Sequence, residues 1–76
     1  IMANISFVNQ KGDVLAHREV DSSMLNTILS LDAVYIGEQL YEIAVCYPVF
    51  EEFNPNDPPK PYGSIDFKVL VFKRNY

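Results

Sequence analysis

The chain has 76 residues, of which 49% are hydrophobic and 21% charged, and its formal net charge at pH 7 is -4. A chain of this length buries only about 60% of the surface that it exposes when unfolded, so a deep substrate cleft is not expected. Its composition is that of a folded domain, and its apolar runs are far shorter than the roughly 20 residues needed to cross a bilayer. We expect one soluble domain over residues 2 to 76, with Met2 as the natural start and Ile1 as a foreign residue.

The first half of the chain indicates a β-hairpin followed by a helix. Residues 3 to 9 and 14 to 20 are rich in apolar and β-branched residues, and Gly12 between them can adopt the positive φ of a tight turn. In residues 21 to 32, Asp21 or one of the next two serines can cap a helix whose apolar residues form one face. We therefore predict a short helix over residues 23 to 30.

The second half of the chain indicates three more strands. A short strand precedes a turn at Gly37-Glu38, a long strand runs from Leu40 toward Phe50, and residues 64 to 75 form a last strand. Pro48 has no N–H to donate, so it is expected at a bulge or on a strand edge. The order β-β-α-β-β-β predicts an α+β, mainly β fold: a strongly bent antiparallel sheet, or a small SH3-like partly open barrel, of about five strands with one short helix. A plain sandwich of sheet and helix is the alternative.

The alternation of residues assigns the faces of the last two strands. Ile65, Phe67, Val69 and Val71 share one side of the last strand and should be core, whereas Leu70 and Phe72 share the other. In the long strand, Tyr41, Ile43, Val45 and Tyr47 are predicted on one side and Leu40, Glu42, Ala44 and Cys46 on the other. The second side of both strands becomes apolar toward the strand end. Either the helix covers this patch, or Leu70 and Phe72 belong to a contact surface for another chain, such as a homodimer.

Few residues indicate chemistry. Cys46 is the single cysteine and fits a small apolar residue within its strand, and His17, the single histidine, fits an exposed strand position. A Cys46–His17 pair that meets in space stays an open alternative. The three glycines form no phosphate-binding loop, and the acidic residues lack the spacing of a calcium loop. We expect no catalytic residues, no cofactor and no metal.

The charges are unevenly distributed along the chain. Between Arg18 and Lys60 there is no Lys or Arg, but there are eight acidic residues: Glu19, Asp21, Asp32, Glu38, Glu42, Glu51, Glu52 and Asp57. Because nucleic-acid binding draws its affinity mainly from Lys and Arg on phosphates, this stretch disfavours direct nucleic-acid binding.

The segment over residues 49 to 63 holds four of the five prolines and joins the last two strands. Its Asn, Asp and Gly residues are typical of turns, which favours a rigid connector, although its P-x-x-P spacing also fits a polyproline II ligand. A rigid loop loses little entropy on binding. We therefore take its acidic and aromatic residues as the candidate partner-binding site: Glu51, Glu52, Phe53, Asp57 and Tyr62.

The hairpin sequence VYIGEQLYEIAVCY, of the form V-x-I-G-x-x-x-Y-x-I-x-V, resembles the central hairpin of small β-rich proteins of bacteriophages and mobile elements. Anti-CRISPR and other anti-defence inhibitors are among these proteins, and many of them bind and block a host protein. The resemblance implies a phage- or prophage-encoded, non-enzymatic inhibitor in the bacterial cytoplasm. Its acidic residues would then imitate a nucleic-acid backbone toward a basic cleft of the host protein.

Two other functions stay open at this point. The first is a self-associating structural domain that uses Leu70 and Phe72. The second is sequestration of a small molecule by Tyr35, Tyr41 and Tyr47.

Overall fold

The computed structural model describes residues 2–50, 54–56 and 64–74. The elements of this part of the chain are β1 (Met2–Val8), β2 (Val14–Asp21), α1 (Ser22–Leu29), β3 (Ala33–Ile36), β4 (Gln39–Val49) and β5 (Ser64–Lys73). They follow the predicted order β-β-α-β-β-β, and the predicted bounds agree to within two residues.

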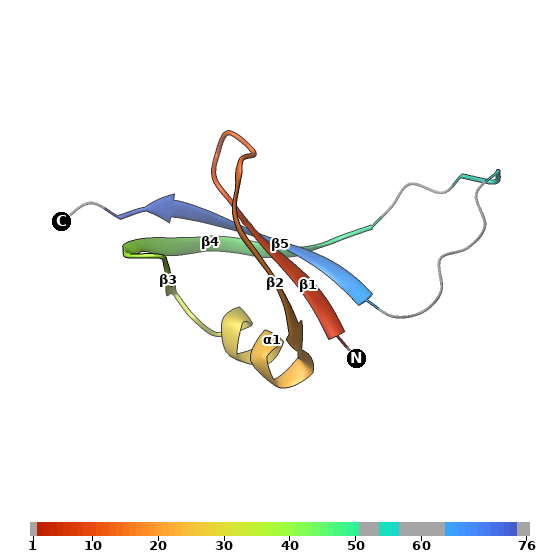
Figure 1. The fold of residues 1–76 in the computed structure, drawn as a ribbon, viewed down its shortest axis with the longest axis horizontal. Coiled ribbons are helices and arrows are strands. Elements are labelled where there is room, and N and C mark those ends of the chain that lie inside the picture. The colour runs from red at the N-terminus through yellow and green to blue at the C-terminus, as the bar shows by residue number, and fades with distance from the viewer. Residues whose placement is uncertain (1, 51–53, 57–63, 75–76) are drawn as a thin grey trace.

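The strands form one strongly curled sheet in the order β2-β1-β5-β4-β3. Figure 1 shows β1 and β2 crossing β4 at a steep angle, which is the curl of a half-barrel. Three strand pairs are antiparallel, and the central pair of β1 and β5 is parallel, so the sheet is mixed. The predicted mainly β fold, with a bent five-stranded sheet and one helix, is confirmed, but the prediction that the whole sheet is antiparallel is wrong, because β1 pairs in parallel with β5. The parallel pair joins the first and last strands, and no hairpin signal in the sequence could indicate it.

The turn between β1 and β2 is held by Asn9. Its side-chain oxygen accepts hydrogen bonds from the backbone N–H of Lys11 at 3.0 Å and of Asp13 at 2.9 Å. Gly12 has a φ of 88°, a conformation that costs an L residue about 1 kcal/mol or more. Asn9 and Gly12 therefore fix the chain reversal that the sequence predicts at this position.

Asp21 caps the helix. Its carboxylate accepts the backbone N–H of Met24 at 2.8 Å and so satisfies one of the donors that a helix start leaves unpaired. The chain then passes from the edge strand β2, through α1, to the opposite edge strand β3. The helix thereby connects the two edges of the half-barrel, as the ribbon in Figure 1 shows.

We expect Asp21→Ala to lower the free energy of unfolding by about 1 kcal/mol, because the cap acceptor is lost. Asp21→Asn removes the charge but keeps the acceptor, so it should retain most of the stability. Urea unfolding of the two variants measures the difference. Equal losses in both would show that the charge of Asp21, and not its hydrogen bond, stabilises the helix start.

The core lies on one side of the sheet, which we call the inner face. Its buried residues come from β1, β2 and β5: Ala3, Ile5, Phe7, Val20, Val69 and Val71. Leu25 and Ile28 of α1 pack against this cluster, as do Val34 and Ile36 of β3. The helix therefore covers the inner face, and the opposite side of the sheet, which we call the outer face, is left without it.

A β-bulge corrects the predicted faces of β4. Ile43 pairs with Val71 and Val45 pairs with Leu70, so Ala44 is an extra residue that shifts the alternation by one. Beyond the bulge, Cys46 lies on the inner face, packed against the core, and Val45 lies on the outer face. The predictions that Val45 and Tyr47 share a side with Tyr41 and Ile43, and that Cys46 faces away from them, are wrong. A strict period of two cannot indicate where a strand inserts a residue.

Candidate functional site

The outer face carries a row of four aliphatic residues across four adjacent strands. Val14 of β2 pairs with Val8 of β1, Val8 pairs with Leu70 of β5, and Leu70 pairs with Val45 of β4. We call this set the aliphatic row. Val8 is only 5% exposed, whereas Val14 is 60% and Val45 46% exposed. The row is thus buried at its centre and open to solvent at its ends.

The apolar surface continues from this row toward the C-terminal end of β5. Phe72 lies next to the row on the outer face of β5, and Leu40 lies on the outer face of β4, beyond Glu42; both are half-buried. We define the apolar half of the outer face as Val8, Val14, Leu40, Val45, Leu70 and Phe72. Because contiguous exposed apolar surface is uncommon on small soluble domains, this half is a candidate contact surface.

The other end of the outer face is acidic. Glu19 of β2, Asn4 of β1 and Asp66 of β5 lie in one row, and the Asn4 amide donates a hydrogen bond to Asp66 at 3.1 Å. Asp21 lies in the next row, opposite Met2. We call Glu19, Asp21 and Asp66 the acidic end. Neither row contains a Lys or Arg among the described residues, so the negative charges are not compensated within them.

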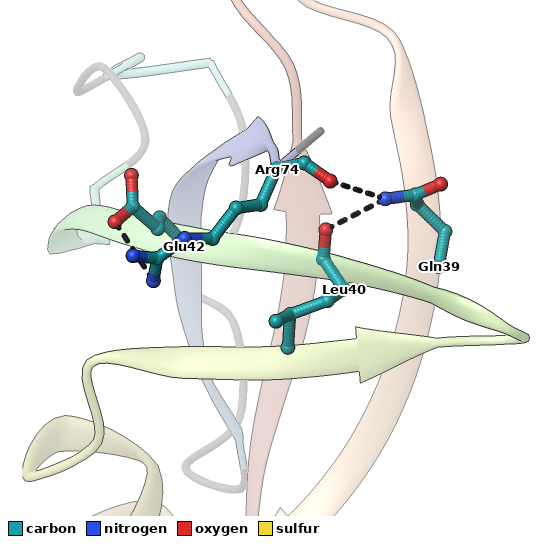
Figure 2. A network of polar contacts seen from close by, with 4 residues as sticks. All are labelled: Gln39, Leu40, Glu42 and Arg74. Carbon is teal, nitrogen blue, oxygen red and sulfur yellow. Dashed lines mark hydrogen bonds and ion pairs between the residues drawn. The ribbon is translucent and has the colours of Figure 1, made fainter. Parts of the chain in front are cut away.

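Polar contacts fix the end of β5 beside the apolar half (Figure 2). The Gln39 side-chain amide donates to the carbonyl oxygen of Arg74 at 2.9 Å and to that of Leu40 at 3.0 Å. The Arg74 guanidinium forms an ion pair with Glu42 at 3.1 Å, and both side chains are about half exposed. Exposed pairs contribute about 1 kcal/mol or less, so their role here is to order the end of β5 more than to stabilise the fold.

The structure places the predicted self-association residues on the outer face. Leu70 and Phe72 are both half-buried there, and α1 packs on the opposite face. Of the two alternatives for this patch, cover by the helix is therefore wrong. The sequence analysis missed Val8, Val14 and Val45, because it had no means of aligning residues of distant strands.

The predicted partner-binding residues Glu51, Glu52, Phe53, Asp57 and Tyr62 lie outside the described residues. The structure does place β4 and β5, the strands on either side of these residues. β4 ends at Val49, which pairs with Asp66 of the acidic end, and β5 begins at Ser64. The segment with these predicted residues is thus attached to the sheet at its acidic end.

The two candidate chemical groupings of the sequence do not come together. Cys46 lies on the inner face and His17 on the outer face, and β1 and β5 separate their strands. Tyr41 packs against the core, whereas Tyr35 and Tyr47 are on the outer face, at different ends of the β3–β4 hairpin. The fold therefore keeps Cys46 and His17 apart, and it does not bring the three tyrosines together within one chain.

Burial raises the pKa of the Cys46 thiol. A higher pKa means less thiolate at a given pH, and the thiolate is the reactive form. We expect Cys46 to react with iodoacetamide at pH 8 more slowly in the folded protein than in urea, where its ordinary pKa returns. Equal rates in the two states, after correction with a free thiol in the same solvents, would contradict this expectation.

The edges of the sheet are protected better than its outer face. β2 carries His17, Arg18 and Glu19 in sequence, and the part of β4 beyond β3 carries Pro48 and the bulge at Ala44. Charges, proline and bulges are the features by which strands resist pairing with other strands. Pro48 thus lies on a strand edge, as predicted. The outer face is therefore a better candidate contact surface than either edge.

No protein-family model, curated protein sequence or solved structure matches this chain. Among the described residues, no group of three His, Cys, Asp or Glu side chains is arranged to hold a metal ion. The described part of the chain also contains no helix with the length and apolar character to span a membrane.

Proposed function

We propose that this chain is a small protein-binding module that recognises a basic surface of another protein through the acidic end of its outer face. The observation that carries the proposal is the gathering of Glu19, Asp21 and Asp66 at the end of the sheet where residues 50 to 63 are attached. That segment contributes Glu51, Glu52 and Asp57 by sequence. Clustered charges of one sign raise the rate of association with a surface of opposite sign and disfavour acidic partners.

The biological setting that we propose is that of a phage- or prophage-encoded inhibitor in a bacterial cell. The acidic end would occupy a basic cleft of a host protein in place of a nucleic-acid backbone, and the bulk of the domain would block access to the cleft. Phe53 and Tyr62 would add aromatic anchors, since aromatic residues often contribute most to a protein interface. The hairpin resemblance and the acidic charge of the chain support this setting.

A defined basic probe tests the electrostatic part of the proposal. We expect Glu19→Lys with Asp66→Lys to weaken binding of a poly-lysine peptide by tenfold or more, measured by calorimetry at low salt. The matched control is Asp32→Lys with Glu38→Lys, which changes the net charge equally, at exposed positions near β3. The control should retain most of the affinity, because charges separated by more than a Debye length of about 10 Å are screened.

Equal loss in both double variants would mean that binding follows net charge alone and would contradict a localised site. Glu51→Lys with Glu52→Lys, which also changes the net charge equally, tests the connecting segment in the same way.

The host target is then sought by capture from a bacterial lysate with the wild-type protein, the acidic-end variant (Glu19→Lys with Asp66→Lys) and the control variant (Asp32→Lys with Glu38→Lys). A specific target is one that the control retains and the acidic-end variant loses.

A further inference from the structure

We propose that the apolar half of the outer face binds the same surface of a second copy of this chain, forming a dimer with two-fold symmetry. The two-fold axis would cross β5 at Leu70 and β4 at Val45, so that each of these two residues meets its own counterpart. This proposal goes beyond binding at the acidic end and uses the other half of the face. The two proposals share Asp66 and the condition that the outer face is uncovered.

The distribution of charge along β5 favours a second copy as the occupant. When an axis crosses β5 at Leu70, residues at equal distances before and after Leu70 meet across the interface. Asp66, four residues before, then faces Arg74 of the partner copy, four residues after. Lys68 likewise faces Phe72, and a cation over an aromatic ring is a favourable contact. The outer side chains of β5 in one copy are therefore complementary in charge to those of β5 in the second copy.

The neighbouring strand β4 agrees with the same axis. Because Ala44 is the extra residue of the bulge, the outer positions next to Val45 are Tyr47 on one side and Glu42 on the other. The axis places the Tyr47 hydroxyl against the Glu42 carboxylate of the second copy, where it can donate a hydrogen bond. In the same way, Val49 of one copy meets Leu40 of the other, so that two apolar side chains are in contact. No like charges are opposed on either strand.

The available area is compatible with a weak specific dimer. Only β4 and β5 continue to both sides of the axis, because β1 ends at Val8 and β2 begins at Val14. Two strands about 4.8 Å apart, over nine residues at about 3.4 Å each, give about 300 Å² for each copy. Specific interfaces bury about 800 Å² for each partner, with transient ones below that. Sheets that pack face to face do so at about 10 Å with their strands nearly aligned, as this axis requires. We therefore expect a monomer–dimer equilibrium that depends on concentration.

The first experiment is light scattering and sedimentation equilibrium of the wild-type chain over a concentration series. A dimer is expected, and Val45→Glu should weaken it more than tenfold, because a charge would be buried without a partner. The matched control is Met24→Glu on α1, since Met24 is 47% and Val45 46% exposed, on opposite sides of the sheet. A wild-type chain that is monomeric throughout, or two variants with equal effects, would overturn the proposal.

Charge exchange tests the symmetry itself. Asp66→Arg alone should weaken the dimer, because it places two guanidinium groups opposite each other across the interface, and Arg74→Asp alone should weaken it by opposing two carboxylates. Both changes together should restore wild-type dimerisation. The double variant still lacks the Arg74–Glu42 ion pair within each copy, so recovery can come only from the contact between copies. A double variant as weak as the single ones would overturn this two-fold arrangement. Thermal melting confirms that each variant is folded.

The dimer test is independent of the test for a basic partner. Poly-lysine binding that is lost in the acidic-end variant, together with a monomeric wild-type chain, would overturn the dimer and leave the proposed function intact. A wild-type chain that dimerises but does not bind poly-lysine would overturn the proposed function and leave the dimer intact.

Discussion

Val71→Glu is expected to abolish cooperative folding. Val71 is 1% exposed in the core on the inner face, and a carboxylate placed there would be buried without a partner. Such burial costs several kcal/mol, or keeps the acid protonated. A 76-residue chain has a total stability of about 4 to 11 kcal/mol. Thermal melting followed by circular dichroism should therefore show no cooperative transition at pH 7.

The neighbouring substitution Phe72→Glu is the matched control. Phe72 lies on the outer face, where it is half-buried and the helix does not cover it. Its replacement should leave a cooperative melt with a stability loss of about 1 to 2 kcal/mol, because a Glu side chain can reach solvent there. Loss of the melt in both variants would show that the outer face belongs to the core, and both proposals would then fail.

Ile5→Ala is expected to cost about 2 to 5 kcal/mol of unfolding free energy. Ile5 has no exposed surface and lies on β1, between β2 and β5, at the centre of the core. Removing its side chain leaves a cavity that its neighbours fill only in part. Urea unfolding would show a lower midpoint with an unchanged slope, if the folded state keeps its structure.

Ile65→Ala makes the same chemical change at a half-exposed position. Ile65 lies on the inner face in register with Ala3, but it is 45% exposed. Its replacement should cost about 1 kcal/mol or less, because little surface is withdrawn from water there. A cost at Ile65 as large as at Ile5 would mean that the core extends to the end of β5 and that this end is covered by another part of the chain.

The two proposals divide one surface between two kinds of partner. The apolar half would join two copies, and the acidic end of each copy would stay at the rim, apart from Asp66, which would face Arg74 of the other copy. A dimer would then present two acidic ends to basic partners. The dimer would thereby raise the effective concentration of the second contact if both ends reach the same target.

The sequence was sufficient to predict the local structure of this protein. The hairpin of β1 and β2 follows from β-branched residues around a turn with Gly12, and the helix start follows from Asp21 before an apolar face. These features depend on residues within a few positions of one another. Local preferences and a period of two or 3.6 are therefore enough to identify them.

The candidate site required the tertiary structure, for two physical reasons. The bulge at Ala44 exchanges the faces of Val45 and Cys46, and nothing in the composition of β4 indicates an extra residue. The aliphatic row exists only because β1 pairs in parallel with β5, which aligns Val8 with Leu70 across 62 positions of sequence. Composition and charge thus determined a small acidic β-rich domain, whereas long-range strand pairing decided which residues share its uncovered face.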